Sequence, residues 1–183
     1  YCMKPLPAIL GLTPTCTSEA TVASKEVIIA LDEGTTNAKA VALDARGRVL
    51  ASCSQPLTIS TPRDGWVEQP AELLIEASIS VLAQVIETVG AENVAALAIS
   101  NQRETAVGWY RRNSSPLGAA LTWQCSRTAG FCQSLRQQGK EARIKAVTGL
   151  PIAPLFSASK MRWLLDSVPN GAELAARGEI CLG

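Results

Sequence analysis

The chain has 183 residues, 47% of them hydrophobic and 18% charged, and a net charge of +1. This composition is typical of a folded globular protein with a sizeable core and excludes a disordered chain. The small net charge gives no electrostatic reason to expect nucleic acid or an anionic membrane as a partner, and no apolar run reaches the roughly 20 residues of a membrane helix.

Residues 1–26 differ from the rest of the chain. The segment starts at Tyr1, and its short apolar stretch is interrupted by proline, unlike the core of a secretory signal. We therefore expect a poorly ordered leader at 1–26, a single domain at 27–183, and a cytoplasmic protein.

The six cysteines are scattered without CxxC spacing, and the chain has no histidine. A zinc site would then need four distant thiolates, so no metal site of that kind is expected. Reduced thiols are the simplest interpretation.

The first predicted elements are three strands in a meander. Residues 27–31 form a continuous apolar run, typical of a strand buried on both faces. Further strands are predicted at 37–43 and 49–55, joined by a turn at 44–48 that carries Asp and Gly.

A helix follows, and then two more strands. Pro70 suits the first position of this helix, and Gly90 ends it. The sequence then predicts a buried strand at 94–100 and a strand at 105–110 that returns beside it. The residues expected on the buried face of the helix are Leu74, Ile75, Ser78, Leu82, Val85, Ile86 and Val89.

The remaining chain predicts helices at 126–138, 141–147 and 157–168, and the start of a strand at 179–182. Strands followed by alternating helices and strands indicate a mixed α/β fold. The glycine-rich signatures GxxxxGK[ST] and GxGxxG are both absent, so neither a P-loop nor a dinucleotide-binding opening is expected.

The segment DEGTTN directly follows the first strand and carries groups suited to phosphate. Gly34 allows close approach of the backbone, and successive N–H groups can form an anion-binding concavity. Asp32 would be repelled by a triphosphate unless Mg²⁺ lies between them. A plain β-turn remains the alternative, since Asp, Gly and Thr are common turn residues. The candidate phosphate ligands are Thr35, Thr36, Asn37 and Lys39.

The segment NQRE follows the strand at 94–100 and ends in adjacent opposite charges. Arg103 can donate hydrogen bonds to the hydroxyls of a polyol and Glu104 can accept them. Trp123, in the TWQ segment, would supply an apolar wall. A surface ion pair beside a core tryptophan is the alternative.

Five segments together resemble the FGGY carbohydrate kinases, and within them the glycerol kinases most closely. They are VIIALDEGTTNAKAVALDARGRVLA, GWVEQPAELL, ISNQRETAVGW, LTWQCSRTA and FSASKMRWLLD, and their order and spacing match as well. The similarity covers about residues 27–183.

The resemblance implies the actin-like, ribonuclease H-like ATPase fold, with a mixed sheet flanked by helices, and here its N-terminal domain, incomplete at the C-terminus. It implies that ATP and Mg²⁺ bind at the DEGTTN loop. Asp32 would be the metal ligand, and the phosphates would contact Thr35, Thr36, Asn37 and Lys39. Lys39 stands where glycerol kinases have arginine. The resemblance assigns the substrate to Thr35, Arg103, Glu104 and Trp123.

Two departures from the family pattern bear on function. Leu155 stands where glycerol kinases have a tyrosine that contacts glycerol, so one hydrogen bond to the substrate is lost. The aspartate expected to accept the proton of the substrate hydroxyl, and the second domain, lie beyond Gly183, so no catalytic residue is assigned within the chain.

The expected activity is ATP-dependent phosphorylation of a terminal hydroxyl of glycerol or a similar polyol, with this chain a fragment that is inactive alone. The alternatives are an FGGY kinase for another sugar or polyol, or a non-catalytic actin-like nucleotide-binding domain. The expected partner is a small-molecule polyol or sugar, and neither nucleic acid nor a membrane is expected. A homo-oligomer of the full-length protein is compatible with this interpretation.

Overall fold

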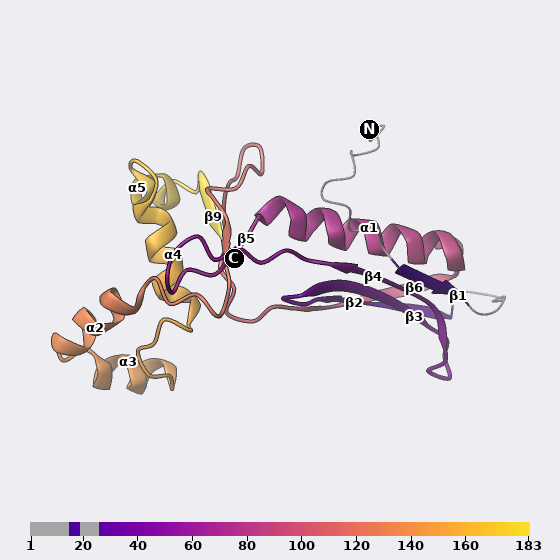
Figure 1. Ribbon diagram of the computed structural model, residues 1–183, viewed down its shortest axis with the longest axis horizontal. Helices are drawn as coiled ribbons and strands as arrows, with labels where there is room; N and C mark the ends of the chain where they lie inside the picture. Colours follow the sequence, from indigo (N-terminus) through magenta and orange to yellow (C-terminus); the bar gives the residue numbers. More distant parts are fainter. Residues whose placement is uncertain (1–14, 19–25) are drawn as a thin grey trace. The chain divides into compact units, whose positions relative to one another are not determined.

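The computed structural model describes residues 15–18 and 26–183, and the chain divides into two compact units (Figure 1). The first unit consists of Tyr1–Leu57 and Ile75–Asn101, and the second of Thr58–Leu74 and Gln102–Gly183.

The first unit is built on a mixed five-stranded sheet of order β1-β4-β3-β2-β6. Strands β2 (Val27–Glu33), β3 (Asn37–Leu43) and β4 (Val49–Pro56) form an antiparallel meander, which confirms the prediction. Strand β6 (Val94–Asn101) runs parallel to β2, and β1 (Thr15–Ser18) pairs with β4. The meander follows from the turn before Val49, where one carboxylate oxygen of Asp44 accepts the backbone N–H groups of Arg46 and Arg48, each at 2.9 Å.

Helix α1 (Ala71–Val89) lies along one face of this sheet (Figure 1). It ends as expected at Gly90, whose φ of 81° suits glycine, and a short 3-10 helix, η1 (Ala91–Asn93), leads into β6. The predicted buried face is confirmed for Val85 and Val89, and Leu82 and Ile86 pack against the core, but Ile75 is exposed, so the prediction is wrong for that residue. The buried residues of α1 are Ala77, Val81, Val85 and Val89.

The prediction that residues 94–100 form a buried strand is wrong as to burial. Strand β6 exists, but its residues from 95 onward are exposed, with Ile99 67% exposed. It lies at the edge of the described sheet, and an apolar strand is buried only when neighbours and helices cover it.

The second unit contains short strands and helices. Strand β5 (Glu68–Gln69) pairs with β8 (Ala120–Leu121), and β7 (Gly108–Tyr110) pairs with β9 (Ile180–Leu182). The strand predicted at 105–110 is therefore shorter and returns beside β9, not beside β6. The helices are α2 (Ala129–Gln137), α3 (Glu141–Thr148), α4 (Ser157–Asp166) and α5 (Gly171–Ala176).

Two helices differ from the prediction for identifiable reasons. Helix α2 begins three residues after Ser126, because the Ser126 N–H and hydroxyl both donate to the carbonyl of Gly65 and so hold that residue in a loop. Helix α5 was not predicted at all, since its six residues are too few to show a helical period.

Parts of the leader and of the cysteine set also differ from expectation. Strand β1 lies inside the segment expected to be poorly ordered, and residues 1–14 and 19–25 lie outside the described residues. Cys53 is disulfide-bonded, so the expectation of reduced thiols is wrong for this residue. Cys125, Cys132 and Cys181 are free. None of the helices in residues 26–183 has the length and apolar character needed to cross a membrane.

Candidate functional site

The turn between β2 and β3 carries the predicted phosphate ligands, all in the first unit. The Gly34 N–H donates to the Asn37 carbonyl at 2.9 Å and closes the turn. A Cβ added at Gly34 would lie 3.0 Å from that carbonyl oxygen, so the tight turn favours glycine. Thr36 and Asn37 are exposed, and the Asn37 amide donates to the Thr36 hydroxyl at 3.1 Å. The turn thus presents hydroxyl and amide groups to solvent.

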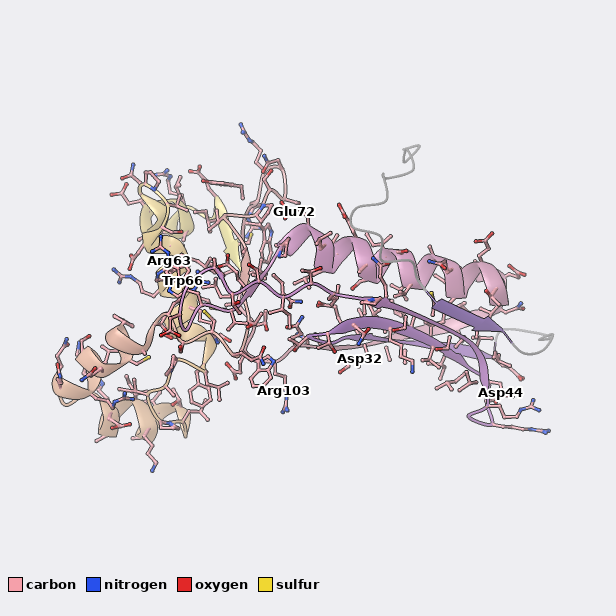
Figure 2. All side chains as sticks on the ribbon, viewed as in Figure 1. Asp32, Asp44, Arg63, Trp66, Glu72 and Arg103 are labelled. Atoms are coloured by element: carbon pink, nitrogen blue, oxygen red, sulfur yellow. The ribbon has the colours of Figure 1, made fainter. Side chains whose placement is uncertain are left out.

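Asp32 and Lys39 lie opposite each other on β2 and β3. Directly opposed residues share a face of a sheet, and alternation along β2 puts this face opposite to the one on which Ile29 and Leu31 are buried. Asp32 projects from the side of the sheet away from α1 (Figure 2). Both side chains are exposed, and neither bonds to another residue of the described part of the chain.

The described residues contain no group of three or more carboxylates or thiols that could enclose a metal ion. A single exposed carboxylate beside hydroxyl donors does fit Mg²⁺, which keeps most of its waters and takes one or two carboxylates plus phosphate oxygens. Asp32 is such a carboxylate, exposed beside the turn that carries Thr35 and Thr36.

The predicted substrate residues of the second unit line one cavity of about 440 Å³. This volume falls in the range of roughly 300–1,000 Å³ typical of small-molecule sites. Arg103, Glu104 and Trp123 lie in it together, as the NQRE and TWQ segments suggested. Thr35, also expected at the substrate, lies in the first unit. The full lining is Gln102, Arg103, Glu104, Trp123, Leu155 and Phe156.

Arg103 and Glu104 do not form the surface ion pair that was the alternative interpretation. Arg103 is exposed, points outward in Figure 2, and makes no hydrogen bond or ion pair within residues 26–183. Glu104 accepts hydrogen bonds at Oε2 from the Ser157 N–H and hydroxyl, both at 2.9 Å, while no described residue donates to Oε1. The guanidinium and one carboxylate oxygen are therefore available to a ligand.

The Ser157 N–H belongs to the first turn of α4, where backbone N–H groups have no partner inside the helix. A carboxylate at that position is stabilised by the helix dipole as well as by the hydrogen bonds. The cavity thus gains a carboxylate whose direction is fixed by α4.

A network of amide and hydroxyl groups holds Gln102 and the backbone of Trp123, which both line the cavity. The Gln102 amide donates to the side chain of Gln69 at 3.1 Å, and the Thr105 hydroxyl donates to Gln102 at 3.0 Å. The same Thr105 oxygen accepts the Trp123 N–H at 3.3 Å. Trp123 is 42% exposed, so the network holds its backbone while the indole remains accessible.

Lys160 is a residue of this region that the sequence did not identify. Its side chain is fully buried (0% exposed), and its ammonium donates to the Glu104 carbonyl at 2.8 Å and to the Leu155 carbonyl. Burial lowers the pKa of Lys160, and the nearby Glu104 charge opposes part of that effect. Its position four residues before Leu164, on the buried side of α4, was the available signal.

Gln102, Phe156 and Ser157 were also missed. Gln102 stands beside Arg103 in NQRE, where a polar side chain next to a charged pair was a usable signal. Ser157 was identified only as a helix start, and its partner lies 53 residues away in the chain, which no local pattern reveals.

A larger cavity of about 640 Å³ in the second unit contains none of the predicted residues. Arg111 lies in its wall but donates to the Gly178 carbonyl at 2.7 Å, and Glu179 pairs with Arg177 at 2.6 Å. Its chemistry offers neither a polyol-binding pair nor a nucleotide site, so the smaller cavity is the candidate site.

Comparison with known proteins shows the family of the chain. Residues 27–180 match the N-terminal domain of the FGGY family of carbohydrate kinases. The chain is 42% identical over 160 residues to a glycerol kinase of Geobacter sp. (strain M21) and 39% identical over 160 residues to one of Burkholderia vietnamiensis. Each match covers 86% of this chain and 32% of the relative, so the chain spans about a third of the length of these relatives.

Solved structures share the fold. The glycerol kinase of Plasmodium falciparum, crystallised with ADP, superposes with a TM-score of 0.79 at 22% identity, over 90% of this chain and 33% of that one. The xylulose kinase of Rhodospirillum rubrum superposes with a TM-score of 0.70 at 24% identity, over 85% of this chain and 32% of that one. At these identities the likeness shows the fold, which is the actin-like ATPase fold of these kinases. Together with the family match, it shows that the chain belongs to the FGGY family of carbohydrate kinases.

Proposed function

We propose that this chain is the polyol- and phosphate-binding part of an ATP-dependent kinase that phosphorylates a terminal hydroxyl of glycerol or a similar polyol. The observation that carries the proposal is the cavity in which Arg103, Glu104 and Trp123 meet. There the guanidinium and the Glu104 Oε1 are open to a ligand. The relatives named glycerol kinase favour glycerol as the first substrate to test.

The cavity has the two kinds of wall that a polyol requires. Arg103 donates to substrate hydroxyls and Glu104 accepts from them, which fixes their directions. Trp123 and Leu155 face the carbon side of the ligand with apolar surface. A short carbon chain with hydroxyl groups toward one side matches this combination.

The turn at Gly34 is the proposed site for ATP. The hydroxyls of Thr35 and Thr36 and the amide of Asn37 would donate to phosphate oxygens, and Lys39 would add positive charge. Asp32 would hold Mg²⁺, whose chemistry is to neutralise charge on the transferred phosphoryl group. The relative crystallised with ADP supports a nucleotide as the ligand.

In the proposed reaction the substrate hydroxyl oxygen forms a bond to the γ-phosphorus, the bond from that phosphorus to the bridging oxygen breaks, and ADP leaves. Arg103 and Glu104 hold the alcohol for in-line attack. The residue that accepts the hydroxyl proton is proposed to be an aspartate outside residues 1–183. We therefore expect this chain to bind ligands without turnover.

The proposal includes a cytoplasmic location, because the reaction uses ATP as a substrate. A homo-oligomer of the full-length protein is compatible with the proposal. The disulfide at Cys53 is unusual for that compartment.

Leu155 supports a second candidate within the same chemistry. Its side chain is 41% exposed at the cavity and offers no hydrogen bond. A lost neutral hydrogen bond is worth about 1 kcal/mol, enough to shift preference toward another polyol or sugar. The shared fold of the xylulose kinase keeps ketoses in the panel of test substrates.

The test is binding of glycerol, longer polyols and xylulose to this chain, measured by calorimetry. Saturable binding of at least one of them is expected, about tenfold weaker in Glu104→Gln, because the charged acceptor is lost. Glu173→Gln on α5, away from the cavity lining, should bind as the wild type does. Xylulose binding more tightly than glycerol would move the assignment to a sugar kinase.

Failure to bind any of these ligands would remove the polyol proposal. Magnesium-dependent ATP binding by the same sample would then favour a non-catalytic actin-like nucleotide-binding domain.

A further inference from the structure

Glu104 has a backbone conformation that its residue type disfavours. Its φ is 66°, in the left-handed region, which Gly and Asn adopt far more readily. A non-glycine residue held there costs conformational free energy and persists only where its surroundings hold it in place. The cavity therefore depends on contacts that keep Glu104 in this state.

Three hydrogen bonds supply those contacts, and all come from α4. Two reach the carboxylate, from the Ser157 N–H and hydroxyl. The third reaches the backbone, where the Lys160 ammonium donates to the Glu104 carbonyl at 2.8 Å. The side chain and the main chain of Glu104 are thus fixed separately by residues one helical turn apart.

The same ammonium donates to a second backbone carbonyl, that of Leu155. Glu104 and Leu155 both line the cavity but are 51 residues apart in sequence, so no local structure sets the distance between them. One buried cation bonded to both carbonyls fixes that distance. Without it, both carbonyl oxygens would lose the donor that the fully buried Lys160 side chain supplies.

We propose that Lys160 is a positioning residue of the polyol cavity: by bonding to the carbonyls of Glu104 and Leu155, it sets the direction of the carboxylate and its spacing from the apolar wall. The proposal rests on the proposed function, because it assigns Lys160 a role in binding the same ligand. Lys160 itself does not touch the substrate.

A purely structural role makes a different prediction. If Lys160 only stabilised the second unit, its loss would lower the folded fraction and weaken all ligands by the same factor. If it positions Glu104, its loss weakens most those ligands whose extra hydroxyl depends on the carboxylate. The ratio of two affinities therefore separates the two roles.

The test compares wild type with Lys160→Met, which keeps a long apolar side chain and removes the donors. Glycerol and propane-1,3-diol, which lacks the middle hydroxyl, are the two probes. We expect glycerol to bind at least about tenfold more weakly and the preference for glycerol to fall at least about threefold. The ¹³Cα chemical shift of Glu104 should move away from its left-handed value.

Leu164→Ala on the same helix is the matched control, since Leu164 is buried but does not line the cavity. It should lower the melting temperature while the glycerol preference and the Glu104 shift stay unchanged. If Lys160→Met shows no cooperative melt, Lys160→Gln takes its place, because it keeps an N–H donor while removing the charge. For this variant the preference for glycerol is expected to fall at least about threefold.

An unchanged glycerol preference and Glu104 shift in the folded variant would overturn the proposal. That result is distinct from failure of the proposed function, which would appear in the wild type as no binding of either probe.

Discussion

Glu104 divides its carboxylate between two tasks. Oε2 is engaged by the first turn of α4, and Oε1 is left for a ligand. Arg103, the next residue along the chain, has no partner in the described part of the protein. Because neither group neutralises the other, both remain able to bind a ligand, and this distinguishes them from an ordinary surface ion pair.

Lys160 gives a prediction for pH dependence. The free energy of unfolding of the wild type, relative to that of Lys160→Met, should rise as the pH increases toward 10.5. Burial lowers the pKa of Lys160 in the folded chain, so below the ordinary value of 10.5 the unfolded chain binds more protons, and stability increases with pH.

Urea denaturation at steps from about pH 7 to about pH 10 measures this difference. Glu104 and the thiols of Cys125 and Cys132 raise the pKa of Lys160 and so oppose burial, which remains the largest effect. A difference in unfolding free energy that is the same at every pH would contradict the lowered pKa.

At the scale of elements, the buried Arg127, in the loop before α2, connects the segment before α1 with α4. The Arg127 guanidinium lies 3.8 Å from the ring centre of Trp66 and 4.7 Å from that of Trp163, and pairs with Glu68 at 2.5 Å. Its Nε also donates to the Cys125 sulfur at 3.0 Å. Because the side chain is only 2% exposed, this cation acts in low-dielectric surroundings.

Arg127→Met should therefore destabilise the chain by about 3–5 kcal/mol, since it leaves Glu68 without its partner and removes the cation from both indoles. Arg177→Met is the matched control: its pair with Glu179 is more than half exposed on both sides, and about 0.5 kcal/mol or less is expected. Chemical denaturation measures both values, and equal losses would show that burial adds nothing to the Arg127 pair.

The two faces of β2 give a second prediction for an element. Ile29 is 1% exposed and Ile28 is 48% exposed, although they are neighbours in sequence. Ile29→Ala should cost about 2–5 kcal/mol by opening a cavity under α1, and Ile28→Ala should cost less than about 1 kcal/mol. The midpoints of urea denaturation decide this, and a larger loss for Ile28→Ala would mean that the register of β2 is reversed.

At the scale of the whole molecule, each of the two units has its own core. The larger one lies between the sheet and α1, and the smaller one gathers around Ala106, Leu121 and Leu164. Strand β6 leaves apolar side chains of the first unit uncovered, with Leu97 49% and Ile99 67% exposed. An exposed apolar edge strand is a site for association between chains.

Ile99→Lys should for this reason reduce self-association of the chain while changing its stability by no more than about 0.5 kcal/mol. Light scattering over a range of concentrations measures the association. Glu87→Gln, at an exposed position of α1, also changes the net charge by +1; it is the control and should leave association unchanged. Equal decreases in both variants would attribute the effect to net charge and not to the edge of the sheet.

The sequence alone determined the features that depend on neighbouring residues. The meander followed from short apolar runs and the Asp44 turn, and the end of α1 followed from Gly90. Five segments identified the family, and among them NQRE and TWQ pointed to Arg103, Glu104 and Trp123 of the cavity. Each of these signals lies within a few residues of the chain, where backbone geometry and side-chain chemistry act directly.

Only the tertiary structure decided that Ile75 of α1 is exposed, that β6 is an exposed edge, and that β7 pairs with β9. It also showed that α4 reaches back more than 50 residues to hold Glu104 through Ser157 and Lys160. These features depend on contacts between distant segments, whose free energy comes from burial and from buried hydrogen bonds. A single sequence carries no local pattern for either of them.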